Sequence, residues 1–173
     1  MQRIMIIGQP GSGKSTLARM LGECLGLPVF HIDHIHWQTG WVERARPDKT
    51  LLCHEIEAGD QWVFEGGHST TWGNRLARAD LLIWLDLPLP LRFYRVVKRS
   101  LRYLGQTRPD LPDGCPERLN AATLTFWRWI WDTRHSARLQ MQRLAVSEAA
   151  SGRLVHLKSP AEVRRWLESL HAK

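Results

Sequence analysis

The sequence has 173 residues, 43% of them hydrophobic and 24% charged, a balance that fits one globular domain and excludes disordered, collagen-like and coiled-coil chains. Its 24 Lys and Arg against 17 Asp and Glu give a formal charge of +7, which favours an anionic partner such as nucleic acid or a phosphate-bearing ligand. The three cysteines are widely spaced, which argues against a disulfide framework or a Cys-x-x-Cys metal site.

The positive charge is concentrated in one part of the chain. Residues 1–86 carry 8 basic and 10 acidic side chains, residues 87–146 carry 11 and 4, and residues 147–173 carry 5 and 3. The middle stretch therefore holds an excess equal to the whole net charge. No apolar run approaches the roughly 20 residues that span a bilayer, and the first run stops at Gly8, too short for a secretory signal. We expect no membrane partner and a cytoplasmic location.

The first elements in the chain are a strand, a glycine-rich loop and a helix. Residues 3–7 form a short apolar run that is typical of a strand buried on both faces. From Ser15 onward, apolar residues recur at helical spacing until Gly26 ends the helix. Similar apolar runs predict strands at 27–31, 62–65, 81–85 and 154–157.

Helical patterns separate most of these strands. They cover about residues 48–58, 89–103 and 120–146, with a possible kink near Asp132 and Thr133, and a last helix starts at Pro160. A cluster of Pro and Gly between 105 and 116 predicts a loop. Alternating strands and helices predict an α/β fold, in which helices cover both faces of a five-stranded parallel sheet.

The loop after the first strand carries a phosphate-binding motif. Residues 8–15 read GQPGSGKS and match G-x-x-x-x-G-K-[ST] in the required position between a strand and a helix. Glycines in this pattern let backbone N–H groups converge on phosphate oxygens at a helix N-terminus. Lys14 is then expected to reach the β- and γ-phosphates of a nucleotide, and the Ser15 hydroxyl to ligate Mg²⁺.

Such a loop needs a carboxylate near the metal, at the carboxyl end of a neighbouring strand. Two residues satisfy this requirement, because Glu65 ends one predicted strand and Asp86 follows the next. We favour Glu65 as metal ligand or catalytic base, since Gly66 and Gly67 after it allow close approach to a ligand. Asp86 could equally cap a helix or pair with Lys14.

The segment 31–37, HIDHIHW, gathers polar and aromatic residues at the end of the second predicted strand. Its spacing fits no established zinc pattern. We interpret Asp33 as a hydrogen-bond acceptor or general base for a substrate hydroxyl. Trp37 and Trp41 could form a wall for a ring-bearing substrate, although core packing explains them equally well. His31 and His36 are more often packing or capping residues.

Basic residues form a stripe on the helix predicted at 89–103. They recur at helical spacing, and further arginines follow in the loop and the next helix. Phosphoryl transfer needs cations that offset charge spread over the phosphate oxygens, so we expect some of this set to bind phosphate. The set comprises Arg92, Arg95, Lys98, Arg99, Arg102, Arg108, Arg134 and Arg138.

Taken together, these segments resemble the adenylate kinase-like group of P-loop nucleoside and nucleotide kinases. The resemblance is carried by GQPGSGKST, the acid at the end of the third strand, the D-x-P after the fourth, the arginine-rich region and a final strand–helix pair. The chain is most similar to the DNA topology modulation (FlaR-like) family, through HIDHIHW, WVFEGGHS, RLARADLLIWLDLP, the segment from RFYRVV to GCPE, and HLKSPAEV. The resemblance spans nearly the whole chain.

The resemblance implies a P-loop NTPase three-layer sandwich with strand order 2-3-1-4-5 and a helical, arginine-rich lid at about residues 103–134 of a single domain, 1–173. It implies ATP and Mg²⁺ as cofactors, with Lys158, Ser159 and Pro160 lining the adenine. It places Asp33 at the acceptor, and Arg75 where related kinases hold an acceptor phosphate. The phosphate loop would use Gly8, Pro10, Gly11, Ser12, Gly13, Lys14, Ser15 and Thr16, and the lid Arg99, Arg134 and Arg138.

Two features depart from adenylate kinases. Glu65-Gly66-Gly67-His68 replaces their D-G-x-P-R pattern, and the region between the second and third strands is too compact for a full nucleoside monophosphate domain. The leading hypothesis is transfer of the γ-phosphoryl group of ATP to a small acceptor, whose identity the sequence leaves open. The alternatives are a DNA-binding regulator that retains nucleotide binding, and an ATPase without an acceptor.

Overall fold

The computed structural model describes residues 1–149 and 152–171. Its main sheet is parallel throughout and has the order β2-β5-β1-β6-β7. The strands are β1 (Arg3–Gly8), β2 (Val29–His31), β5 (Trp62–Glu65), β6 (Leu81–Leu85) and β7 (Leu154–Leu157). β3 (Trp37–Gln38) and β4 (Val42–Glu43) form a separate hairpin, so the third strand of the main sheet in chain order is labelled β5. Counted within the main sheet alone, the order is the expected 2-3-1-4-5.

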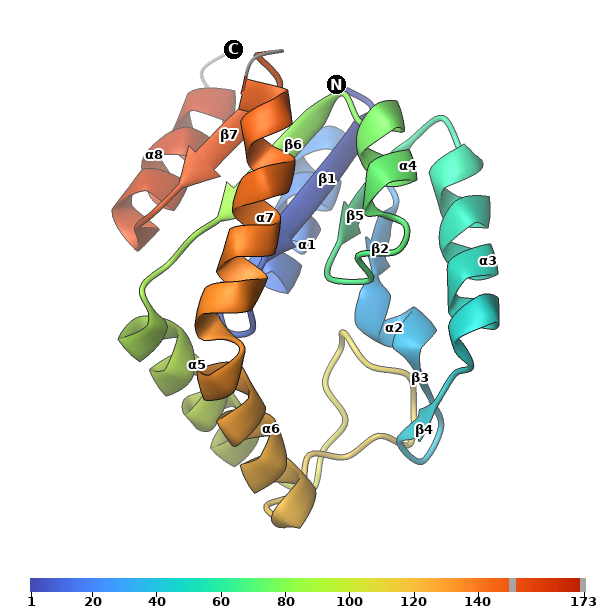
Figure 1. Ribbon diagram of the computed structural model, residues 1–173, viewed down its shortest axis with the longest axis vertical. Coiled ribbons are helices and arrows are strands. Elements are labelled where there is room, and N and C mark those ends of the chain that lie inside the picture. The colour runs from blue at the N-terminus through green and yellow to red at the C-terminus, as the bar shows by residue number, and fades with distance from the viewer. Residues whose placement is uncertain (150–151, 172–173) are drawn as a thin grey trace.

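Helices cover both faces of this sheet, as predicted (Figure 1). The helices are α1 (Lys14–Leu25), α2 (Ile32–His36), α3 (Arg46–Ala58), α4 (Trp72–Arg78), α5 (Leu89–Arg102), α6 (Ala121–Asp132), α7 (Arg134–Ala149) and α8 (Pro160–His171). Alternate residues of β1 separate two cores: Met5 and Ile7 pack with α2, α3, α4 and α7, whereas Ile4 and Ile6 pack with α1 and α8. The result is a three-layer sandwich.

The long helix predicted over 120–146 is two helices. Asn120 caps α6 by accepting a hydrogen bond from the Thr123 backbone N–H, and α6 ends at Asp132. After Thr133 the chain continues as α7, so the kink expected near this position is confirmed as a break. The segment 103–120 between α5 and α6, hereafter the connecting loop, contains no helix or named strand. None of the described helices is long and apolar enough to cross a membrane.

Three short elements had not been predicted. Residues 32–36 form helix α2 instead of extending a strand, α4 occupies 72–78, and the β3–β4 hairpin occupies 37–43. Each contains too few residues to show a clear period, and the strands of the hairpin have two residues each. Predicted boundaries elsewhere shift by about two residues: β2 starts at Val29 instead of Leu27, and α3 starts at Arg46 instead of Asp48.

Candidate functional site

The phosphate loop lies between β1 and α1, at the carboxyl edge of the sheet. Gly11 and Gly13 have φ of 78° and 93°, in the left-handed region that only glycine enters readily. A Cβ on Gly11 would come within 2.2 Å of the Arg92 carbonyl oxygen, so the loop packs directly on α5. Ser12 is buried and its carbonyl accepts a hydrogen bond from Arg95. The N-terminus of α1 lines the cavity described below.

Glu65 is the carboxylate that the structure brings to this loop. One of its oxygens, Oε1, accepts a hydrogen bond from the Ser15 hydroxyl at 2.9 Å and lies 2.8 Å from His31 Nδ1. The other oxygen, Oε2, is 3.8 Å from Lys14 Nζ. Burial acts to raise the pKa of Glu65, but Lys14 and His31 outweigh it and the pKa is lowered. Glu65 is therefore a buried anion with its charge directed at the phosphate loop.

The Glu65 side chain also fits the expected metal chemistry. Its Oε2 atom is buried and accepts no hydrogen bond from the described residues. This free acceptor is one that a hydrated cation would satisfy. Ser15 supplies a hydroxyl beside it, and hard cations such as Mg²⁺ take oxygen ligands and retain several waters. The described residues contain no group of three His, Cys, Asp or Glu suited to holding a metal, so segment 31–36 forms no zinc-type cluster.

A cavity of about 690 Å³ opens from the phosphate loop. Residues 11–16 line one side, the connecting loop another, and apolar residues of β6 and α8 a third. Its lining is strongly cationic, with eight basic side chains and a single acidic one, Asp110. The eight are Lys14, Arg19, Arg95, Lys98, Arg99, Arg102, Arg108 and Arg164. This composition suits a ligand with several negative charges.

Arg99 is the lid arginine best placed for such a ligand. It lines the cavity, and its Nε has no hydrogen-bond partner within the described residues. Burial lowers the pKa of Arg99, and the positive charge of Arg108 acts in the same direction. Arg108 itself is compensated by Asp110 at 2.8 Å and Glu117 at 2.7 Å. Arg99 thus carries a partly buried charge that an anion would stabilise.

Two arginines of the basic stripe on α5 are engaged within the protein, whereas Lys98 and Arg102 are exposed and line the cavity. Arg92 is buried and donates hydrogen bonds to the carbonyls of Leu87 and Pro10. Arg95 donates to the carbonyl of Ser12. These two arginines hold α5 against the phosphate loop.

Asp33 lies on α2, close to the same centre. Burial raises the pKa of Asp33, while Lys14 and Arg108 act to lower it. Glu65 and Asp110 act in the same direction as burial. Asp33 is not among the residues that line the cavity. A carboxylate with a raised pKa near Lys14 can accept a proton from a substrate hydroxyl.

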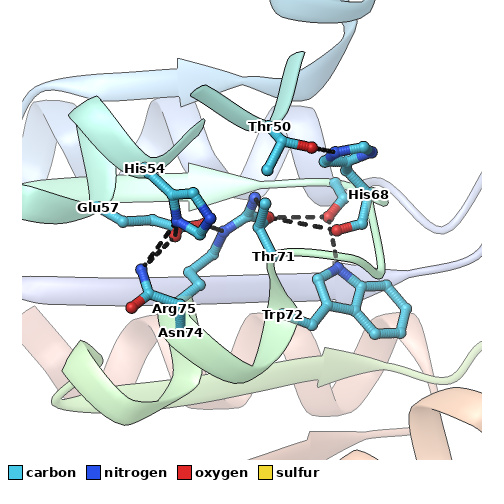
Figure 2. A network of polar contacts seen from close by, with 9 residues as sticks. Thr50, His54, Glu57, His68, Thr71, Trp72, Asn74 and Arg75 are labelled. Atoms are coloured by element: carbon cyan, nitrogen blue, oxygen red, sulfur yellow. Dashed lines mark hydrogen bonds and ion pairs between the residues drawn. The ribbon is translucent and has the colours of Figure 1, made fainter. Parts of the chain in front are cut away.

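Arg75 is engaged within the protein (Figure 2). Its guanidinium is fully buried and donates to Glu57 at 3.0 Å, to the Thr71 hydroxyl at 3.0 Å and to the Gly66 carbonyl at 3.3 Å. It also stacks 3.6 Å above the centre of the Phe64 ring. With these donors occupied, Arg75 supports the loop after Glu65 and does not present a free group to an acceptor phosphate.

Asp86 also has a structural set of partners. Both its oxygens accept hydrogen bonds from Arg138, at 2.8 and 2.7 Å, and Oδ2 lies 3.1 Å from His156 Nε2. Burial acts to raise the pKa of Asp86, but Arg138 and His156 lower it. His156 stacks on Trp84 with ring centres 4.0 Å apart. Asp86 thus joins β6, β7 and α7. Of the carboxylates weighed for Lys14, Glu65 is the one that lies near it.

Of the remaining predicted residues, Pro160 lines the cavity and the others lie outside its lining. The side chain of Arg134 donates to the Trp131 carbonyl and packs on the Trp131 ring, so it turns toward α6. Ser159 caps α8 through Glu162, while Pro160 lines the cavity. Gly8 and Pro10 shape the phosphate loop without lining the cavity. Trp37 packs edge-to-face against His36 and Trp41.

Sequence reasoning missed one member of this site. His31 had been assigned to packing or capping, yet it pairs in register with Glu65 across β2 and β5 and contacts its carboxylate. The signal was available in part, since both residues end predicted strands. What the sequence lacked was the adjacency of those two strands.

Sequence comparison finds two curated relatives. A cytidylate kinase of Pyrobaculum aerophilum is 34% identical over 113 residues, covering 56% of this chain and 60% of the relative. A chloroplastic shikimate kinase of Solanum lycopersicum is 25% identical over 180 aligned residues, covering 92% of this chain and 58% of the relative. The chain thus spans about three-fifths of the length of these relatives. No family model matches the chain.

Structure comparison supports the fold over nearly the whole chain. Shikimate kinase from Acinetobacter baumannii in complex with shikimate superimposes with a TM-score of 0.53, 18% identity and coverage of 99% and 94% of the two chains. Shikimate kinase from Aquifex aeolicus superimposes with a TM-score of 0.54 and 15% identity, and the alignment covers 98% of this chain and 96% of that one. These proteins give no support for the DNA topology modulation family. The chain has the α/β fold of P-loop kinases and is similar in sequence to members of that group.

Proposed function

We propose that this protein is a phosphotransferase that uses ATP and Mg²⁺ to phosphorylate a small-molecule acceptor. The carrying observation is the buried Glu65 carboxylate, which bonds Ser15, faces Lys14 and keeps one oxygen without a hydrogen-bond partner beside a cationic cavity. Nucleotide phosphates would lie on residues 11–16, with Pro160 and its apolar neighbours near the base. Mg²⁺, when bound at Ser15 and Glu65, supplies charge neutralisation for the transferring phosphoryl group.

In the proposed reaction, an acceptor oxygen bonds to the γ-phosphorus while the bond from that phosphorus to the β–γ bridging oxygen breaks, releasing ADP. Asp33 accepts the proton of an acceptor hydroxyl, because its raised pKa, on which the charges of Lys14 and Glu65 both act, suits a base. Lys14 and Arg99 offset the charge on the phosphoryl oxygens. Residues 103–134 act as the lid of a single domain, 1–173. Trp37 is proposed as an acceptor wall through its contact with His36 on α2.

The relatives suggest two classes of acceptor. One is a nucleoside monophosphate, from the similarity to cytidylate kinase, and the other is a hydroxylated carboxylic acid, from the similarity to shikimate kinase. The compact region between β2 and β5 and the occupied donors of Arg75 favour the smaller, hydroxyl-bearing acceptor.

The decisive test is a transfer assay with γ-labelled ATP and Mg²⁺ against nucleosides, nucleoside monophosphates, hydroxy acids and phosphorylated sugars. The expected result is label in one acceptor class, lost in Lys14→Ala while that variant keeps its unfolding midpoint. Label that appears only in inorganic phosphate would instead identify an ATPase. Equal turnover by Lys14→Ala would overturn the proposal.

A further inference from the structure

Helix α6 exposes apolar side chains that a helix of a globular domain normally buries. Ile130 is its buried residue, whereas Leu124, Trp129 and Trp131 are 63%, 48% and 55% exposed. Phe126 is also exposed and stacks on Trp129, with ring centres 5.9 Å apart. The helix lies at the end of the molecule away from the N-terminus (Figure 1). A helix that is apolar on most of its sides is usually covered, so this surface points to a partner.

The amount of exposed apolar surface on α6 is close to what a dimer interface requires. An aromatic side chain buries about 150–250 Å² when it is fully covered, so the exposed rings of Phe126, Trp129 and Trp131 leave about 200–350 Å² in contact with water. Leu124 on α6 and Leu139 on α7 are also exposed and add to this area. A stable dimer buries about 800 Å² per partner, and somewhat more than half of it is apolar.

Small and charged residues form a central line on the exposed side of α6. They recur at helical spacing opposite the buried Ile130, and in chain order they are Ala121, Thr125, Arg128 and Asp132. Apolar residues flank this central line on both sides. Leu124 and Trp131 form one flank, and Phe126 and Trp129 form the other.

The two charges of the central line complement each other across a two-fold axis. The side chains of Arg128 and Asp132 are 84% and 58% exposed, and within one helix Arg128 Nε lies 3.5 Å from Asp132 Oδ2. When two copies of α6 lie antiparallel about an axis midway between these residues, Arg128 of each copy faces Asp132 of the other. The same rotation brings each apolar flank against the same flank of the second copy.

A shallow groove extends this face onto α7. It has a volume of about 450 Å³ and lies at the break between α6 and α7. Its lining combines Trp129 and Leu139 with polar side chains and the cation of Arg143. In the antiparallel arrangement, the first turn of the second copy's α6, which begins with Ala121 and Ala122, passes over this groove. Small side chains at these positions allow the two helices to approach closely.

Other classes of partner suit the same face less well. A lipid layer would receive Arg128 and Asp132 at the centre of the contact, and charges are costly in an apolar layer. A nucleic acid binds unpaired cations and stacks its bases on aromatic rings, whereas Arg128 is paired and Leu124 offers no ring. A second copy satisfies both charges and covers both flanks.

We propose that two copies of this chain form a dimer through antiparallel α6 helices, with reciprocal pairs of Arg128 and Asp132 between two apolar flanks. Trp129 should contribute most to the affinity, because tryptophan is frequent among the residues that dominate binding at interfaces. The dimer goes beyond phosphoryl transfer and does not depend on it. No described residue of α6 lines the cationic cavity, so substitutions on this face leave the lining of the cavity unchanged.

Sedimentation equilibrium of the full chain over a wide range of concentration measures the association. The wild-type mass should approach twice the chain mass of 20.0 kDa. Trp129→Ala should raise the Kd of the dimer at least about 30-fold. Leu124→Ala should raise it less, and Leu51→Ala is its matched control, because Leu51 is 61% exposed on α3 and lies outside this face. Circular dichroism confirms that each variant is folded.

Charge reversal tests the reciprocal pairs. Arg128→Asp and Asp132→Arg each set like charges against one another in a homodimer, and each should raise the Kd more than about tenfold. Mixing these two variants creates opposite charges at both contacts, so the mixture should form a heterodimer with an affinity near that of the wild-type dimer. The double variant, which exchanges the two charges within one chain, should dimerise on its own.

A wild-type chain that stays monomeric at the highest concentrations would overturn the proposal. A dimer that Trp129→Ala and both charge reversals leave intact would also overturn it, because its interface would lie elsewhere. Failure of the two mixed charge variants to associate would contradict the reciprocal pairs. Binding of a monomer to phosphatidylglycerol vesicles or to single-stranded DNA, lost in Trp129→Ala, would assign the face to that partner and overturn the dimer.

Discussion

Strand β1 divides the carboxyl edge of the sheet into two halves with similar equipment. Each half has a carboxylate at the end of the strand beside β1, Glu65 on one side and Asp86 on the other, and each has an arginine predicted to bind phosphate. The partners differ. Glu65 meets Ser15 and Lys14 and keeps Oε2 without a hydrogen-bond partner, whereas both oxygens of Asp86 accept hydrogen bonds from Arg138. Position at a strand end therefore makes a residue available to a ligand, and its partners decide whether it is used.

The arginines of the two halves give the largest expected contrast. Arg75 and Glu57 are both fully buried, so Arg75→Met leaves an unpaired carboxylate in the core and should cost about 3–5 kcal/mol in the free energy of unfolding. Arg138 is half exposed, and Arg138→Met should cost about 1 kcal/mol or less. Urea denaturation measures both. Equal losses would show that the two ion pairs are equivalent.

The carboxylates should differ in activity. Glu65→Gln keeps the size of the side chain and removes the charge that faces Lys14, so phosphoryl transfer should fall at least about 100-fold while nucleotide binding persists. The measurement is kcat with the acceptor found in the transfer screen. A Glu65→Gln variant within tenfold of wild type would remove Glu65 from the catalytic set.

Asp86→Asn should show the opposite pattern. It weakens the pairs with Arg138 and His156, which predicts a loss of about 1 kcal/mol in stability because Arg138 is half exposed. Phosphoryl transfer should stay within about tenfold of wild type, since the Asp86 carboxylate faces these two side chains and not Lys14. A large fall in kcat with unchanged stability would reverse the roles assigned to the two halves.

A third carboxylate, Asp80, belongs to neither half and should affect stability alone. Burial acts to raise the pKa of Asp80, but backbone N–H groups of Gln2 and Arg3 and the Arg3 guanidinium outweigh it and lower the pKa to about 2. Because the folded pKa lies below the ordinary value, ionised Asp80 stabilises the fold above about pH 4, and this is lost as pH falls toward 2. Asp80→Asn should lower the unfolding midpoint at pH 7, and the difference from wild type should shrink toward pH 2, with activity unaffected.

The features that could be predicted from the sequence are those that depend on local residue patterns. Five strands, the phosphate loop and the break near Thr133 follow from apolar runs, glycine spacing and helical periodicity, and all are present. Glu65 was preferred to Asp86 on the glycines that follow it, and its contacts with Ser15 and Lys14 agree with that preference.

What could not be predicted depends on pairings between distant residues. Arg75 and Arg138 fit a phosphate role by position, but their partners Glu57 and Asp86 lie 18 and 52 residues away and leave no local pattern. His31 was overlooked for the same reason, since its partner Glu65 lies 34 residues further on. Short elements such as α2 and the β3–β4 hairpin form through tertiary contacts, and they are too short to show a hydrophobic period in the sequence.

The attachment of α5 to the phosphate loop has a mechanical consequence. Arg92 and Arg95 fix the first turns of this helix to the carbonyls of Pro10 and Ser12, and the close approach at Gly11 prevents sliding there. The helix has 14 residues and so extends about 21 Å, with the connecting loop at its far end. The contacts of Arg92 and Arg95 act as a pivot about 10–15 Å from the end of the helix, so a tilt of about 10° there displaces that end by about 2–3 Å. A small tilt at the phosphate loop is thereby passed to the connecting loop, which follows this helix and also lines the cavity.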